Sequence, residues 1–137
     1  MTKRIIYYYQ TFVGLKNILN SNNKVTHIHL SSIHFGQTDS NTPYIHLNDC
    51  SPYDSKFDSV WEDLKAAKEH GIKIILMVGG AGGAFQELFS NFNTNYSLLR
   101  ELVVNKKDLI DGIDLDIEEE VNIIDVENLI KQLKNDV

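Results

Sequence analysis

The 137-residue sequence is poor in several residue types, and each scarcity excludes a class of protein. A single cysteine, Cys50, cannot form an internal disulfide, so the fold does not depend on an oxidising compartment. There are 13 Lys and Arg against 19 Asp and Glu, which gives a formal charge of −6. This balance, without any basic cluster, argues against a nucleic-acid partner.

Long hydrophobic runs are missing as well. The apolar stretch at residues 74–78 is far too short to span a bilayer, so we expect no membrane partner. The N-terminus has a basic start but lacks the long apolar region and the small-residue cleavage site of a signal peptide. We therefore expect a chain in a reduced, cytoplasmic compartment.

The residues that are present suffice for one folded domain over residues 1–137. The hydrophobic share of 42% supports a core, and the charged share of 23% is too low for a disordered chain. Short apolar runs, predicted as strands, alternate with segments of helical spacing. The predicted strands are residues 5–9, 25–35, 72–78 and 109–117, and the predicted helices are residues 12–19, 55–70, 84–89 with 96–104, and 126–133. Residues 37–55 predict a long loop with a small hairpin at 44–47. This order predicts an α/β fold with parallel strands and right-handed crossovers.

The fourth run alternates acidic and apolar positions. Asp114, Asp116 and Glu118 would share one face of a strand, and the apolar residues between them would pack against helices. Like charges about 6–7 Å apart favour a protonated carboxylic acid, which is the form that a general acid needs. Glu118 lies nearest the C-terminal end of the strand, where barrel enzymes place their chemistry. Two other interpretations stay open, a helix cap or solvated face and a divalent-cation site.

The residues Asp111, Gly112, Asp114, Asp116 and Glu118 fill every defined position of the pattern Asp-Gly-x-Asp-x-Asp-x-Glu. This pattern resembles the signature of family 18 glycoside hydrolases, which include chitinases and endo-β-N-acetylglucosaminidases. The resemblance implies a (β/α)₈ barrel, of which this chain would hold strands one to four. It implies no cofactor and no metal.

The resemblance also implies a role for each carboxylate. Glu118 would protonate the glycosidic oxygen, Asp116 would orient the N-acetyl group of the substrate, and Asp114 would tune Asp116. Asp111 and Gly112 would serve the structure of the motif. The acetamido oxygen would act as the nucleophile, so that β-1,4 N-acetylglucosamine linkages in chitin or a related glycan are cleaved with retention.

Residues 77–80, Met-Val-Gly-Gly, depart from the Ser-x-Gly-Gly pattern of the family at one position. Gly79 and Gly80 are expected to let the backbone approach the acidic strand and the substrate closely. Met77 brings no hydroxyl group, which puts the tuning of Asp114 in doubt. A phosphate-binding loop is the rival interpretation of the glycines, but no Gly-Lys-Ser/Thr follows them.

Further candidates come from aromatic and histidine positions. Tyr8 and Phe85 are expected to contact the substrate, although the tyrosines at 7–9 could equally pack in the core. His27 and His29 share a face, for which we favour a structural polar lining over a metal pair. Trp61 is expected to pack against its helix neighbours.

The length sets one more expectation. A complete (β/α)₈ barrel takes about 250 residues, so this chain is expected to be a truncated catalytic domain with two open sheet edges. Its partner would be a missing C-terminal half-barrel or a second copy. The alternative to an enzyme is a catalytically inactive fragment, or a carbohydrate-binding or interaction module.

Overall fold

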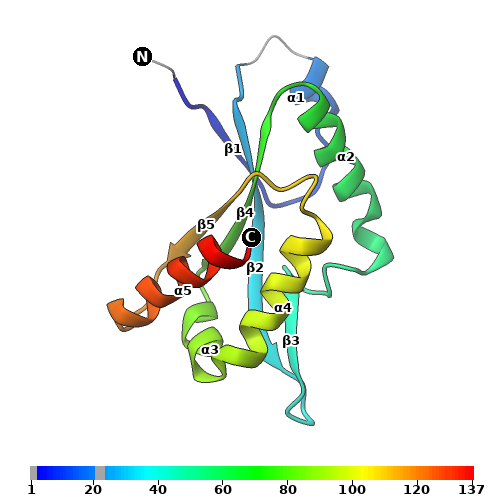
Figure 1. Ribbon diagram of the computed structural model, residues 1–137. Helices are drawn as coiled ribbons and strands as arrows, with labels where there is room; N and C mark the ends of the chain where they lie inside the picture. The colour runs from blue at the N-terminus through cyan, green and yellow to red at the C-terminus, as the bar shows by residue number, and fades with distance from the viewer. Residues whose placement is uncertain (1–2, 21–23) are drawn as a thin grey trace.

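The computed structural model describes residues 3–20 and 24–137 (Figure 1). A five-stranded sheet has the order β1-β2-β4-β5, with β3 paired to β2. The strands are β1 (Ile6–Tyr9), β2 (His27–Gln37), β3 (Pro43–Leu47), β4 (Lys73–Gly80) and β5 (Gly112–Ile117). The helices are α1 (Lys16–Asn20), a 3₁₀ turn (Ser55–Phe57), α2 (Asp58–Glu69), α3 (Ala84–Ser90), α4 (Phe92–Asn105) and α5 (Ile123–Asp136).

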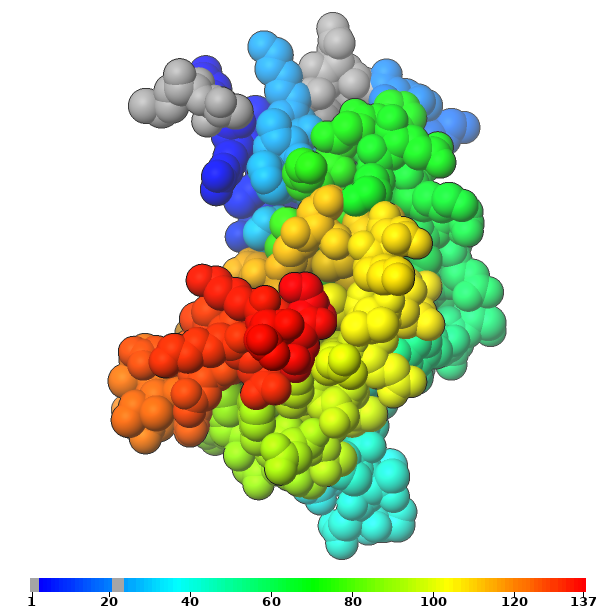
Figure 2. Space-filling view, viewed as in Figure 1, coloured from blue at the N-terminus to red at the C-terminus, as the bar shows by residue number. Residues whose placement is uncertain are grey.

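Strands β1, β2, β4 and β5 run parallel, which confirms the predicted α/β fold. One or more helices follow each of these strands along the chain, and the longer helices bury an apolar stripe. The buried residues include Val60, Trp61, Leu64 and Ala67 of α2, Tyr96, Leu99, Leu102 and Val103 of α4, and Val126, Leu129 and Leu133 of α5. Figure 2 shows α2, α4 and α5 side by side on one face of the molecule. No helix of the described part of the chain is long and apolar enough to cross a membrane.

The longest strand, β2, extends past its neighbours and turns back into β3. The hairpin predicted at residues 44–47 is thus present, and β3 pairs antiparallel with the end of β2. The register against β4 shifts between Leu30 and Ile33, and the peptide bond between Ser31 and Ser32 is cis. The register shift falls just before Ile33, where β2 begins to pair with β3.

The start of β5 is tied to the rest of the sheet by Asp111. Its carboxylate accepts hydrogen bonds from Lys68 Nζ at 2.9 Å and from the Ile74 N–H at 2.9 Å. Gly112 follows, and a Cβ there would lie 3.1 Å from Ile75 Cδ1. Asp111 thus ties the start of β5 to α2 and β4, and Gly112 lies close against β4.

Trp61 has the predicted packing role. Only 8% of its surface is exposed, and its indole N–H donates to the Pro52 carbonyl at 3.1 Å. Lys106 Nζ lies 4.5 Å from the centre of its ring. Burial of the ring with its polar N–H satisfied is the usual arrangement for a core tryptophan.

Candidate active site

A cavity of about 540 Å³ opens where the parallel strands end. Its lining consists of Tyr8, Gln10, Ser31, Ser32, His34, Met77, Gly79, Gly80, Ala81, Asp114, Asp116 and Glu118. The structure thus brings together six residues that the sequence singled out, the three carboxylates with Tyr8, Gly79 and Gly80. Parallel α/β sheets bind their ligands at this end of the strands.

The three carboxylates differ in their surroundings. Asp114 and Asp116 are half-buried within β5, whereas Glu118 is exposed and lies one residue beyond the end of the strand. Within the described residues, the side chains of Asp116 and Glu118 have no hydrogen-bond or ion-pair partner. Both carboxylates therefore line the cavity unpaired by any described side chain.

Asp114 has a partner that the sequence did not reveal. Its Oδ2 lies 3.0 Å from Nδ1 of His29, which is only 9% exposed. The ring of Tyr8 packs edge-on against the His29 imidazole, with 5.1 Å between the ring centres. The neighbouring Met77 instead accepts a hydrogen bond from Ser31 Oγ at 3.2 Å. His29, from β2, is therefore the side chain that contacts Asp114.

The spacing of the histidines predicted an interior lining but not this pairing. His29 and Asp114 are 85 positions apart in the sequence, and only the strand order brings them together. His27 is oriented differently, with its Nδ1 2.7 Å from Thr26 Oγ1. Among residues 3–20 and 24–137, no three His, Cys, Asp or Glu side chains converge as a metal site requires.

The glycines lie close to the acidic strand, as predicted, and their contact with a substrate stays a prediction. A Cβ on Gly79 would lie 2.3 Å from the Asp116 carbonyl oxygen and 2.5 Å from Phe85 Cε2. The φ of Gly79 is +103° and that of Gly80 is +89°, a region that L side chains rarely adopt. A Cβ on Gly80 would lie 3.7 Å from Asp116 Oδ2, so this backbone borders the carboxylate directly.

Phe85 corrects one expectation. It is fully buried and packs under Gly79 and against Phe89, with ring centres 6.2 Å apart. It does not line the cavity, because α3 turns its first apolar residues toward the core. The predicted sugar contact of Phe85 is therefore wrong for this structure, and its role is packing.

Glu119 shows that the acidic run serves two purposes. Its carboxylate accepts the N–H groups of Phe85 at 2.7 Å and of Gln86 at 3.0 Å, at the start of α3. A carboxylate at this position satisfies free N–H groups and complements the helix dipole. The helix-capping interpretation of the acidic run thus holds for Glu119, and the cavity interpretation holds for Glu118.

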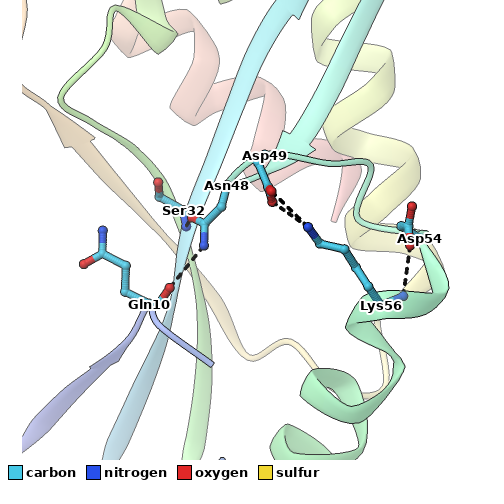
Figure 3. A network of polar contacts seen from close by, with 6 residues as sticks. All are labelled: Gln10, Ser32, Asn48, Asp49, Asp54 and Lys56. Atoms are coloured by element: carbon cyan, nitrogen blue, oxygen red, sulfur yellow. Dashed lines mark hydrogen bonds and ion pairs between the residues drawn. The ribbon is translucent and has the colours of Figure 1, made fainter. Parts of the chain in front are cut away.

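Asn48 connects the first two strands beside the cavity (Figure 3). Its Oδ1 accepts the Ser32 N–H at 3.0 Å, and its Nδ2 donates to the Gln10 carbonyl at 3.1 Å. Ser32 Oγ lies 2.7 Å from Nε2 of His34, another lining residue. Nothing in the sequence pattern pointed to Asn48, because its contacts depend on how the hairpin folds back.

Comparisons with known proteins agree with this geometry. The family described as "Glycosyl hydrolases family 18" matches residues 4–137. A chitinase from Aspergillus fumigatus is 30% identical, with a TM-score of 0.87 over 99% of this chain and 51% of its own. A fungal endo-β-N-acetylglucosaminidase of family 18 is also 30% identical, with a TM-score of 0.85 over 99% of this chain and 51% of its own. The chain thus spans about half the length of these solved structures. A search of curated proteins found no match.

Proposed function

The chain belongs to glycosyl hydrolase family 18, and on this premise we propose that its cavity serves the cleavage of β-1,4 linkages between N-acetylglucosamine units of chitin or a related glycan. The observation that carries the proposal is the row of carboxylates on β5. Their surroundings change from paired at Asp114 to unpaired and exposed at Glu118, within one cavity.

Glu118 is suited to the role of general acid. A proton donor must reach the leaving oxygen and then recover its proton from water, which requires an accessible carboxyl group. Its position after the last residue of β5 meets that requirement. We infer that Glu118 protonates the glycosidic oxygen and later activates the water that releases the product.

Asp116 and Asp114 would act on the N-acetyl group. Asp116 has no partner among the described side chains, so it can accept the amide N–H of the substrate and hold the acetamido oxygen toward the anomeric carbon. The acetamido oxygen bonds to the anomeric carbon as the glycosidic bond breaks, which forms an oxazolinium ring. Water then opens the oxazolinium ring, with net retention at the anomeric carbon. Asp114, held by His29, is the next residue on the same face of β5 and would tune Asp116.

The open side of the cavity sets a condition on this proposal. The sheet order leaves β1 and β5 each with a single strand neighbour in the described part of the chain. Catalysis also requires the sugar to be held in a reactive geometry, to which a further part of a barrel would contribute. A second candidate function, favoured by this open cavity, is binding of the glycan without turnover.

One experiment separates the two functions. The 137-residue chain is incubated with the nitrophenyl glycosides of chitobiose and of cellobiose, which differ in the acetamido group. Substrate-assisted hydrolysis predicts release of nitrophenol from the chitobioside alone, and NMR of the first product should show the β-anomer. Equal release from both glycosides would contradict the mechanism. Binding of chitobiose without release would establish the second candidate.

A further inference from the structure

The β2–β3 hairpin extends beyond the ends of the other strands (Figure 1). One of its residues, His34, lines the cavity. His34 on β2 lies directly opposite His46 on β3, and Gly36 lies opposite Tyr44. Directly opposed residues of an antiparallel pair point to the same face of the sheet. Since His34 lines the cavity, His46 and Tyr44 lie on the cavity side of the hairpin.

The two side chains form a stack. The rings of Tyr44 and His46 are 3.8 Å apart at an angle of 22°, and both residues are half-buried. A Cβ on Gly36 would lie 2.4 Å from the Tyr44 hydroxyl oxygen, so the phenol ring rests directly over that glycine. The opposite face of β3 is buried through Ile45 and Leu47. One face of β3 is thus packed in the core, and the other face carries the rings of Tyr44 and His46.

The chemistry of this surface suits a neutral ligand. Burial lowers the pKa of His34 and of His46. The negative charges of Glu119 near His34 and of Asp49 near His46 act in the opposite direction, but burial outweighs them. Both imidazoles are therefore mainly neutral at pH 7. Aromatic rings beside neutral hydrogen-bonding groups match the apolar face and the polar edge of a sugar, whereas a phosphate or carboxylate ligand would require cations.

We propose that Tyr44 and His46 form a distal sugar subsite, continuous with the cavity through His34. The proposal rests on the function proposed above and adds which part of a longer glycan is recognised. Tyr44 and His46 point to the same side of β3, and because their rings stack 3.8 Å apart they form one continuous surface. In this proposal, a long oligosaccharide that begins at Glu118 and runs along the β2–β3 hairpin past His34 contacts Tyr44, and a disaccharide held at Glu118 does not.

The test measures the affinity of the 137-residue chain for the dimer and the pentamer of β-1,4 N-acetylglucosamine by calorimetry. Tyr44→Ala should weaken pentamer binding about tenfold and leave the dimer within about twofold, as expected for the loss of one aromatic contact. Tyr44→Phe keeps the ring and should restore most of the pentamer affinity. Gly36→Ala should resemble Tyr44→Ala, because its methyl group displaces the ring without removing it.

Tyr53→Ala is the matched control, since Tyr53 is 47% exposed and lies outside the cavity lining. Its melting temperature and oligosaccharide affinities should equal those of the wild type. Equal affinity of the wild type for dimer and pentamer, or an unchanged pentamer affinity in Tyr44→Ala, overturns the distal subsite while the proposed function stands. A wild type that binds neither oligomer overturns both.

Discussion

The two ends of β5 carry the same kind of side chain in opposite circumstances. At the start of the strand, Asp111 is held by Lys68 and by the Ile74 N–H, and 22% of its side chain is exposed. Beyond the other end, Glu118 is exposed and has no side-chain partner within the described residues. The Asp111 carboxylate thus joins α2, β4 and β5 through its hydrogen bonds, whereas the Glu118 carboxylate is available to a ligand.

This difference follows from the direction of the strands. At their N-terminal ends the chain arrives from helices, and a carboxylate there can bind a helix lysine and a strand N–H. At their C-terminal ends the chain leaves through loops such as the one at Gly79 and Gly80, which leave room for a cavity. The motif thus places one carboxylate in structural contacts at the start of β5 and, in the proposed function, reactive carboxylates toward its end. The following experiments test that division.

Glu118→Gln should have the largest effect. If Glu118 is the general acid, the rate of glycoside hydrolysis falls about 10²–10⁴-fold, because the amide cannot donate the proton. Melting temperature should stay the same, since Glu118 is exposed. Glu120→Gln is the control, an exposed carboxylate outside the cavity lining. If the two variants hydrolyse the glycoside at equal rates, Glu118 is not the general acid.

Gly79→Ala should damage the fold at the reactive end. The methyl group meets the Asp116 carbonyl and Phe85, and the positive φ adds strain. Gly71→Ala shares a positive φ of +83° but meets nothing within 4 Å, so it should cost only about 1–2 kcal/mol. We expect Gly79→Ala to lose about 1–3 kcal/mol more, measured by urea unfolding. Equal losses would mean that the close approach to β5 is unimportant.

Asp111→Ala should reduce stability without affecting the cavity. It leaves the Ile74 N–H unpaired, which costs about 1–3 kcal/mol in the free energy of unfolding. Affinity for chitobiose should not change, because Asp111 lies at the opposite end of β5. A change in affinity without a change in stability would reverse the roles assigned to the two ends.

The lowered pKa of Asp111 predicts a pH dependence of the free energy of unfolding. Burial by itself raises the pKa of Asp111, but the hydrogen bonds from Lys68 and Ile74 and the charges of Lys68 and Lys73 outweigh it, so the pKa lies below its ordinary value. A lowered folded pKa contributes stability above the unfolded pKa of about 3.9, and this stability is lost as the pH falls through the folded pKa. The stability advantage of wild type over Asp111→Asn should therefore be constant near neutral pH and shrink below about pH 4. An advantage that grows in acid would contradict the assignment.

Glu119→Gln should have the smallest effect. Glu119 is a structural carboxylate at the reactive end, where it binds the first N–H groups of α3. Glutamine keeps one acceptor and loses the charge, for a loss of about 0.5–1 kcal/mol in thermal unfolding. Glu120→Gln serves again as the control and should be neutral. If the two variants have the same free energy of unfolding, the contacts of Glu119 with the start of α3 do not contribute to stability.

Much of the fold could be predicted from the sequence because its signals are local. The near-continuous apolar run at residues 72–78 predicted a strand, and β4 is that strand, with most of its residues buried. The alternation at 113–118 predicted that Asp114, Asp116 and Glu118 share one side of a strand, and all three line the cavity. The glycines at 79 and 80 indicated the close approach that the structure contains.

The rest depends on contacts between distant residues. The pairing of His29 with Asp114 and the bridge that Asn48 makes to Gln10 and Ser32 arise only when strands are ordered in the sheet. Phe85 was misassigned because a residue after a glycine turn can point either to the cavity or to the core. Its direction was decided by the packing of α3 under Gly79.

The most direct test of the contrast between the two ends is an NMR titration of the ¹⁵N-labelled chain with chitotetraose. The account predicts shifts of the backbone amides at residues 77–81 and 114–118, with none at residues 108–112. Shifts confined to the region of Asp111, or no shifts at all, would contradict the placement of the sugar site at the C-terminal end of β5.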